Sequence, residues 1–265
     1  MGNLPLYASE DHPDRRPPHA HAGLWYDKFC DTWNADFRGF PNNGEGKRDW
    51  IFQFDGNSDA TPVGERDQLV STVERRRKLV AAREGKSVKF TTRSRFVTGL
   101  GREHPVENGF AWHPTLGTPF LPGSGVKGVV RAWAEQWLDE DDPSREDVER
   151  IFGVQEQVGS VVFLDAVPTA PTRLEADVMT PHYGPWYQQG PPEVPADWHS
   201  PTPIPFLTVA AGATFHFGIL PRHPDDEQAA RDVEVAAGWL EKALNWIGAG
   251  AKTAVGYGRF RSEKQ

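Results

Sequence analysis

Hydrophobic and polar residues alternate most clearly in SVKFTTRSRFVTG, which spans residues 87–99. Because successive side chains of a strand point to opposite faces of a sheet, this pattern predicts a β-strand with two unlike faces. One face is apolar or small: Val88, Phe90, Thr92, Ser94 and Phe96. The other face is mostly basic: Lys89, Thr91, Arg93 and Arg95. We expect the first face to pack on the core.

Apolar residues recur every three or four positions in three longer segments, as in an amphipathic helix. The first spans residues 65–84, with Leu69, Val73 and Val80 on one face and Gly85 as its stop. The second follows the glycines of residues 123–128, and its apolar face is Val126, Val129, Val130, Trp133 and Trp137. The third spans residues 225–247 and begins with two Asp at its positive end. Its apolar face is Val233, Ala237, Leu240, Leu244 and Ile247.

Shorter segments complete the predicted fold. Residues 145–152 predict a short helix, and GSVVFLDA (159–166) predicts a buried strand. PFLTVAAGATFHFGIL (205–220) predicts two strands around Ala-Gly, and GAGAKTAVGYGRF (248–260) a glycine-rich turn and a last strand. The order strand, helix, strand, strand pair, helix, strand is a βαββαβ plan with an extra hairpin. It predicts an α+β protein of the ferredoxin-like (RRM-like) class.

The remaining segments carry little regular pattern. Residues 1–64 are rich in Pro, Gly, Asn and aromatic residues, so we expect few regular elements there. We divide the chain into an N-terminal extension with one helix, residues 1–86, which packs on a ferredoxin-like domain, residues 87–265. Residues 166–205 contain ten prolines, which neither a helix nor a sheet interior tolerates, so we expect a long insertion. Its aromatic residues favour a functional loop.

Composition narrows the class of protein. The 265 residues contain no apolar run near the roughly 20 residues of a membrane span. The N-terminus has no apolar core of signal-peptide length, so we expect a cytoplasmic protein without membrane contact. The single cysteine, Cys30, excludes an internal disulfide and a multi-cysteine zinc site, and we expect it to be a small buried side chain. The formal net charge of −8 argues against a protein that coats nucleic acid unaided.

The charges are nevertheless distributed unevenly. Residues 71–102 contain ten Lys or Arg and two Glu, whereas residues 135–149 contain eight acids and one Arg. This segregation is typical of a protein with one anion-facing surface and another that meets a basic partner. Two ordinary solvated faces give the same pattern, and this alternative stays open, above all for the acidic run.

Gly123, Gly125 and Gly128 have the G-x-G-x-x-G spacing of a dinucleotide-binding turn, with Lys127 among them. Two prolines interrupt the strand that such a turn needs, and no acid ends a second strand about 20 positions on, so a nucleotide cofactor is disfavoured. A Walker site is excluded because Gly128 follows Lys127. Free N–H groups at a helix N-terminus still attract a phosphate, and Lys127 and Arg131 share one helix face nearby. A turn required only for helix packing explains the spacing equally well.

A second glycine cluster, GAGAKTAVGYG (248–258), repeats these elements with a lysine, a hydroxyl and an aromatic residue, so that the two turns would flank one groove. PGSGVKGVVR (122–131) followed by GAGAKTAVGYGRF resembles the RAMP superfamily of CRISPR RNA-binding proteins. HPTLGTPFLPGSGVKGVVRAW, LEADVMTPHYGPWY, PIPFLTVA and GAKTAVGYGRF, with GLWYDKF near the N-terminus, are similar in particular to the family that forms the sixth subunit of the type III-B CRISPR Cmr effector complex. The matching segments lie between residues 23 and 260.

The resemblance implies a ferredoxin-like domain that grips the CRISPR guide RNA near its 3′ end, with the C-terminal glycine loop on the RNA backbone. It also implies a thumb inserted between strands, which residues 166–205 match in position. By position, the residues expected along the RNA path are Gly123, Ser124, Lys127, Arg131, Gly250, Lys252, Thr253 and Tyr257. Further candidates are His182, Tyr183, Trp186 and Tyr187 in the thumb, and Arg93 and Arg95 on the basic strand face. Gly125 departs from the family, which often has a second serine there.

The resemblance also implies partners. They are the guide RNA, the target RNA and other Cmr subunits of a hetero-oligomer: the last backbone RAMP, a small helical subunit and a neighbouring head RAMP. Because the chain is acidic overall, we expect it to bind RNA weakly alone and fully only when assembled.

We predict no catalytic residue, no cofactor and no metal. The loop that carries the catalytic acid in the RNA-cutting RAMP subunit has Glu103 and Glu107 here but no Asp. The favoured hypothesis is a non-catalytic, architectural RNA-binding subunit. One alternative is a metal-independent endoribonuclease that processes guide RNA through His104 or His113, and a more remote one is a nucleotide-dependent enzyme. His19 and His21 lack an evident third ligand, and we expect them in a flexible tail.

Overall fold

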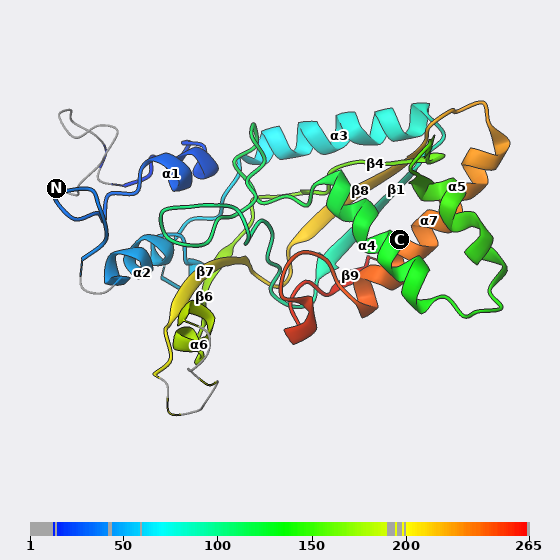
Figure 1. Ribbon diagram of the computed structural model, residues 1–265. Coiled ribbons are helices and arrows are strands. Elements are labelled where there is room, and N and C mark those ends of the chain that lie inside the picture. Colours follow the sequence, from blue (N-terminus) through cyan, green and yellow to red (C-terminus); the bar gives the residue numbers. More distant parts are fainter. Residues whose placement is uncertain are drawn as a thin grey trace.

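The computed structural model describes residues 13, 15–41, 44–58, 60–189, 194, 198 and 200–263. Helices and antiparallel strands alternate along the chain, as predicted for an α+β protein. Figure 1 shows a central sheet with helices on both faces. Among the helices in this part of the chain, none is both long and apolar enough to cross a membrane.

The central sheet consists of β1 (Lys86–Thr92), β4 (Val161–Phe163), β5 (Val167–Pro168), β8 (Thr214–Pro221) and β9 (Phe260–Ser262). Its strand order is β4-β8-β1-β9, with β5 also paired to β8, and every pair is antiparallel. Phe215, Phe217 and Ile219, which alternate along β8, are buried. Phe217 meets Phe90 of β1 edge-on, with ring centres 5.4 Å apart. These aromatic contacts fix β1 and β8 side by side.

The strand predicted over residues 87–99 is shorter in the structure. β1 ends at Thr92 because the chain bends at Arg93 and Ser94, and Phe96 then pairs with Val209 of a different sheet. The alternation also breaks at the end of β1, where Thr91 and Thr92 are both buried.

Helices α4 (Gly123–Trp137) and α7 (Glu227–Trp246) cover one face of the sheet (Figure 1). Asp226 begins α7 as its N-cap and accepts a 2.9 Å hydrogen bond from the Gln228 N–H. This bond satisfies one of the free donors of the first turn. The predicted apolar positions Val233, Leu240 and Leu244 are buried.

Helix α3 (Arg66–Ala82) lies on the opposite face of the sheet (Figure 1). Glu65 caps it by accepting a 2.8 Å hydrogen bond from the Gln68 N–H. Leu69 and Val80 are almost fully buried and Val73 is 8% exposed, so the predicted apolar face is confirmed. A small second core of buried residues lies beneath its first half: Leu69, Val73, Ala111, Leu116, Phe120 and Val167.

The predicted short helix over residues 145–152 is split into η3 (Pro143–Asp147) and α5 (Val148–Phe152). A small hairpin of β2 (Gly153–Val154) and β3 (Gln157–Val158) follows. Arg150 of α5 pairs with Asp147 at 2.5 Å and with the buried Asp232 of α7 at 2.8 Å. Part of the acidic run is therefore used for contacts within the chain.

The N-terminal residues are more regular than expected. Besides α3, the segment predicted to contain one helix contains α1 (Ala22–Lys28), α2 (Glu45–Phe52) and the short η2 (Gly56–Ser58). Trp25, Tyr26 and Trp50 are buried and join the main core, and Cys30 is buried as expected. His21 lies in a defined position and not in a loose tail, because its Nδ1 caps α1 by accepting from the Leu24 N–H at 3.0 Å.

The expectation that residues 166–205 form an irregular insertion is wrong for part of that range. β6 (Leu174–Met179) pairs antiparallel with β7 (Ile204–Val209), and α6 (Gly184–Gln189) lies at the end of this hairpin (Figure 1). The prolines before β7 flank the LEADVM strand and do not interrupt it. β7 and β8 are the two predicted strands around Ala-Gly, but they belong to different sheets.

Candidate nucleic-acid interface

The C-terminal glycine cluster forms a loop, residues 248–258, which we call the glycine loop and which includes η4 (Thr253–Val255). It lies along the segment that follows β1: the Gly258 N–H donates to the Arg95 carbonyl at 2.7 Å, and the Ala251 N–H donates to the Val97 carbonyl at 2.8 Å. Gly250 has φ +85°, and a Cβ there would lie 2.0 Å from the Val97 oxygen. Glycine is therefore required for this close approach.

Two predicted side chains of the glycine loop point toward the β6–β7 hairpin. Lys252 Nζ lies 5.4 Å from the centre of the Phe206 ring and 3.6 Å from the Met179 sulfur. Tyr257 donates a 2.6 Å hydrogen bond to Asp177. Thr253, at the start of η4, is half-buried.

Arg95 belongs to the same cluster. Its Nε lies 2.7 Å from Glu175 and its Nη1 lies 2.6 Å from Asp177. Burial alone raises the pKa of Asp177, but hydrogen bonds from Tyr257, the Val178 N–H and Arg95 outweigh it and hold that pKa below its ordinary value. Burial and the Asp177 carboxylate together raise the pKa of Tyr257 to about 12. At neutral pH Asp177 is thus ionised and Tyr257 is a hydrogen-bond donor.

Arg93 lies at the edge of this region and is exposed. Its Nη1 donates a 3.0 Å hydrogen bond to Asn245 near the end of α7. The structure therefore brings together one group of predicted site residues: Arg93, Arg95, Gly250, Lys252, Thr253 and Tyr257.

The first glycine turn has a different environment. The Gly123 N–H donates a 2.6 Å hydrogen bond to the Asp165 carboxylate. A Cβ at Gly123 would lie 2.3 Å from the Phe163 carbonyl oxygen. At Gly123 the geometry thus favours the helix-packing explanation, and a carboxylate of the same chain occupies the N–H assigned to a phosphate. Ser124 is exposed, and Gly128 has open space around it.

Lys127 and Arg131 line an open hollow of about 570 Å³ between α4 and the β2–β3 hairpin, together with Arg222. Burial and then the charges of Arg131 and Arg222 lower the pKa of Lys127. Arg131 pairs with Glu135 at 2.6 Å, whereas Lys127 has no ion pair with any residue that the structure describes. We call this cationic site the α4 hollow.

Strand β8 separates the α4 hollow from the glycine loop. Arg222 directly follows Pro221, the last residue of β8, whereas Thr214 at its start pairs with Thr91 near the glycine loop. The eight residues of β8 span about 25 Å. Arg222 of the α4 hollow and the glycine loop thus lie near opposite ends of β8, and we treat them as two basic regions; that the two glycine turns flank one groove stays a prediction.

The predicted thumb contacts lie around α6, away from the paired part of the hairpin (Figure 1). Tyr187 is 74% exposed and His182 is exposed, whereas Tyr183 and Trp186 are half-buried. Tyr187 and His182 are thus the accessible members of the four candidates.

Both histidines considered for catalysis are held in local contacts. His104 has a side chain only 4% exposed; its Nε2 donates to the Tyr26 carbonyl at 3.1 Å and its Nδ1 accepts from the Val106 N–H at 3.2 Å. Burial lowers the pKa of His104 to about 4, although Asp27 lies 3.7 Å away. His113 Nδ1 accepts from the Thr115 N–H at 3.3 Å. Within the described ranges, no group of three or more His, Cys, Asp or Glu is arranged to hold a metal.

Sequence reasoning missed several residues of these regions. Glu175 and Asp177 alternate in LEADVM, which is the available signal that they share one face of a strand. Phe206 and Arg222 have no comparable signal, because their neighbours come from distant parts of the chain.

Comparisons with known proteins agree with these features. The model of the RAMP superfamily matches residues 89–261, which contain most of the central sheet, α4, α7 and the glycine loop. A CRISPR system Cmr subunit Cmr6 of Pyrococcus furiosus is 33% identical over 234 residues, which cover 65% of this chain and 66% of that relative. A subunit of the same name from Saccharolobus solfataricus is 31% identical over 179 residues, which cover 66% of this chain and 56% of that relative. The chain thus spans less than two thirds of the length of either relative.

A similar fold occurs in a chain of the type III-B Cmr-beta complex, whose structure was determined with bound cognate target RNA. That chain superimposes with a TM-score of 0.63 and 27% identity, over 82% of this chain and 71% of its own length. The likeness therefore extends beyond the segment that matches the superfamily model.

Proposed function

This chain belongs to the RAMP superfamily, and on that premise we propose that it is a non-catalytic, RNA-binding architectural subunit of a type III-B CRISPR Cmr effector complex. Its role would be to grip the guide RNA near its 3′ end and help position the target RNA. Both similar sequences carry the name Cmr6, and the similar structure comes from a Cmr complex bound to target RNA.

The topology supports a ferredoxin-like core for this function. β1, α4, the β4–β5 edge, β8, α7 and β9 follow one another as a βαββαβ unit, and α4 and α7 share one face of the sheet. The β6–β7 hairpin and α6 interrupt this order between β5 and β8. We assign this inserted hairpin as the thumb.

The observation that carries the proposal is the geometry of the glycine loop. Backbone contacts to the residue 95–97 segment hold it in place, and Lys252 is positioned beside the hairpin. Around Gly256, apart from its two chain neighbours, no atom of the described residues lies within 4 Å of where a Cβ would be, so an RNA backbone has room to approach the chain. Arg95 already pairs with Glu175 and Asp177, so Lys252 is the better-placed cation for a first phosphate contact.

The α4 hollow supplies a second cationic region. Lys127, Arg131 and Arg222 converge there on one face, and such a cluster attracts a polyanion. We infer that the guide RNA contacts the two regions as separate phosphate sites. The net charge of −8 opposes RNA binding by the lone chain, so full affinity requires the neighbouring subunits. As neighbours we propose the last backbone RAMP, a small helical subunit and another head RAMP.

The proposal is tested with the full chain, alone and assembled with its sibling subunits, and labelled guide-like RNA. Lys252→Gly removes the cation and gives the position, which has φ +60°, a residue suited to that conformation. We expect weaker RNA binding with no loss of stability and no cleavage products. Lys78→Ala is the control, because Lys78 is an exposed α3 residue whose ion pair to Glu74 is long, at 3.8 Å.

Unchanged affinity in Lys252→Gly, or cleavage that His104→Ala or His113→Ala abolishes, would overturn the proposal. The second result would instead support the histidine-dependent endoribonuclease. The contacts of His104 and its lowered pKa do not favour that alternative.

A further inference from the structure

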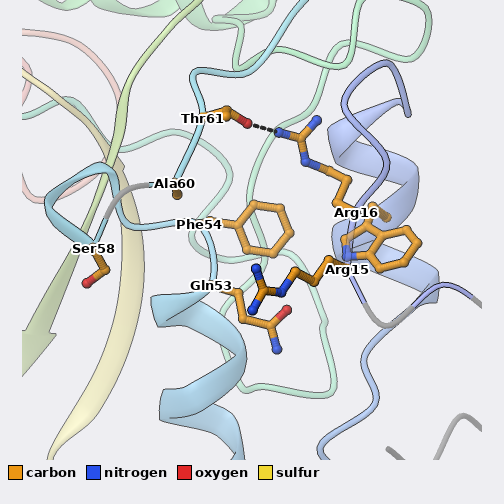
Figure 2. A pocket seen from close by; sticks show the side chains of 8 residues that line it. Arg15, Arg16, Gln53, Phe54, Ser58, Ala60 and Thr61 are labelled. Atoms are coloured by element: carbon orange, nitrogen blue, oxygen red, sulfur yellow. Dashed lines mark hydrogen bonds between the residues drawn. The ribbon is translucent and has the colours of Figure 1, made fainter. Parts of the chain in front are cut away.

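A second kind of anion site lies at the N-terminal end of the molecule. An open hollow of about 510 Å³ is formed between the segment before α1 and the loop that follows α2; we call it the N-terminal hollow. Figure 2 shows Arg15, Arg16, Gln53, Phe54 and Thr61 around it. Apart from Trp25, which lies in GLWYDKF, no residue of this hollow was singled out by the sequence, and the superfamily match begins only at residue 89.

Arg16 is the central group of the N-terminal hollow. Its Nη2 donates to the Thr61 hydroxyl at 2.8 Å and its Nη1 donates to the Ala20 carbonyl at 3.2 Å. Both partners are neutral, and within the described part of the chain no carboxylate pairs with this guanidinium. Partial burial lowers the pKa of Arg16, so the charge is held in a site that solvates it poorly. An anion in the hollow would compensate this desolvation.

Arg15 provides a second guanidinium at the other side of the hollow. Its side chain is exposed, and it makes no ion pair with the residues that the structure places. In Figure 2 its guanidinium ends near Gln53, and the ring of Phe54 lies between the two arginines. Two guanidiniums with amide and hydroxyl groups beside them match the donor pattern that a phosphodiester requires.

The location distinguishes this hollow from the glycine loop. α2 packs on β7, and η2 packs on β6, where a Cβ at Gly56 would lie 3.0 Å from the Leu174 carbonyl. Glu175 and Asp177, on the other face of β6, meet Arg95 and Tyr257. Figure 1 accordingly shows α2 and the glycine loop on opposite sides of the β6–β7 hairpin. A phosphate bound at one site is therefore not the phosphate bound at the other.

We propose that the N-terminal hollow binds a phosphodiester of single-stranded RNA between Arg15 and Arg16, on the side of the hairpin opposite the glycine loop. This inference rests on the proposed RNA-binding function and adds a separate site to it. An acidic segment of a neighbouring protein offers the same charge, but RNA is favoured because the structurally similar chain belongs to a complex with bound target RNA. The phosphodiester has two possible sources, the guide strand and the target strand.

The test measures RNA affinity of the full chain, assembled with its siblings, as a function of salt. The probes are guide-like single-stranded RNA alone and the same RNA with its target. Each phosphate that the protein no longer neutralises reduces the slope of log affinity against log salt by about 0.7, so Arg15→Gln with Arg16→Gln, which together hold one phosphodiester, reduces it by about 0.7. A reduced slope with the guide-like RNA alone assigns the bound phosphodiester to the guide strand. A slope reduced only when the target RNA is present assigns it to the target strand.

Arg38→Gln is the matched control, because Arg38 is exposed in the same N-terminal region and does not line the hollow. Arg16 also bridges two segments through Ala20 and Thr61, so Arg16→Gln can lower stability. Thermal unfolding shows which variants are folded. If Arg16→Gln is unstable, Arg15→Gln alone tests the inference, because Arg15 does not bridge two segments as Arg16 does. Crosslinking of 4-thiouridine RNA to residues 53–61, lost in Arg15→Gln, gives an independent readout.

Three outcomes overturn the inference. An unchanged slope and unchanged crosslinks in Arg15→Gln, with weaker binding in Lys252→Gly, remove the N-terminal hollow and leave the proposed function intact. Unchanged binding in both variants removes the proposed function as well. Loss of subunit assembly with intact RNA affinity assigns the hollow to a protein partner.

Discussion

Tyr257 donates a 2.6 Å hydrogen bond to Asp177, a residue 80 positions earlier in the chain. The same carboxylate oxygen lies 2.6 Å from Arg95 Nη1. One acidic group thus connects the glycine loop, the segment after β1 and strand β6. Lys252, on the same loop, is thereby held beside the hairpin, where the proposed RNA contact occurs.

Tyr257→Phe removes this hydrogen bond and keeps the ring. We expect the free energy of unfolding to fall by about 1–2 kcal/mol, because a hydrogen bond to a charged, partly buried acceptor is lost. Urea denaturation measures the change. Tyr187→Phe is the control, since Tyr187 is 74% exposed, and it should leave the unfolding free energy unchanged. Equal stability of Tyr257→Phe and the parent chain would show that the bond contributes nothing.

Much of the fold was predictable because α3 and α7 each bury one continuous face, and β8 is buried along almost its whole length. Their apolar residues recur at the period of the element, so the sequence carries the signal locally. The helices α1 and α2 have only seven and eight residues, too short for such a period, and their burial depends on Trp25, Tyr26 and Trp50 meeting the distant core. β6 was missed because the prolines around it hid a six-residue strand.

The candidate site was predictable only in its local parts. Glycines and a lysine in GAGAKTAVGYG indicate a tight loop with a cation, and the structure has both. The pairing of Tyr257 with Asp177 and of Gly123 with Asp165 depends on tertiary contacts over 80 and 42 residues. No local pattern encodes which carboxylate accepts a hydrogen bond from which donor. The sequence therefore could not show that the Gly123 N–H donates to Asp165 and is not free for a phosphate.

Gly250→Ala tests the close approach of the glycine loop to the Val97 carbonyl. Gly250 and Gly256 both have positive φ, +85° and +99°, and alanine costs about 1–2 kcal/mol at either position for that reason alone. Only Gly250 would also place its Cβ 2.0 Å from a backbone oxygen. We expect Gly250→Ala to lose clearly more unfolding free energy than Gly256→Ala in thermal or urea denaturation. Equal losses would mean that the loop moves aside at little cost.

The buried histidines predict a loss of stability at mildly acidic pH. Burial lowers the pKa values of His104 and His216 to about 4, with nearby arginines and Lys89 adding to the effect at His216. In the unfolded chain both have pKa values of about 6.5. Between these values the unfolded state binds more protons, so the free energy of unfolding decreases as pH falls from about 6.5 to about 4.

The two histidines can be separated by mutation. His104→Gln should flatten the pH dependence in that window, and the part that remains is the contribution of His216. Chemical denaturation at a series of pH values gives the slope directly. A slope in His104→Gln identical to that of the parent chain would show that His104 does not remain neutral in the folded protein.

The exposed tyrosine of α6 provides a test of the thumb. Because Tyr187 is 74% exposed, Tyr187→Ala should leave the unfolding free energy nearly unchanged. Stacking of one RNA base on an aromatic ring contributes about 1–3 kcal/mol, so RNA affinity of the assembled complex should fall roughly 5- to 160-fold if Tyr187 stacks. Trp186→Ala is less informative, because Trp186 is half-buried and its loss also affects packing. Unaltered affinity in Tyr187→Ala would remove this residue from the RNA path.

The separation of the two basic regions predicts how their mutations combine. Lys127→Ala and Lys252→Gly should each weaken RNA binding with little loss of stability, since neither lysine forms an ion pair with a described residue. Arg222 of the α4 hollow and the glycine loop lie near opposite ends of β8, which is about 25 Å long, and effects of sites more than about 10 Å apart are usually additive. The double variant should therefore lose the sum of the two binding free energies, measured by titration of labelled guide RNA. Lys78→Ala serves as the charge-matched control. A double variant no weaker than Lys252→Gly alone would show that RNA contacts the two lysines through one coupled groove and not as two separate regions.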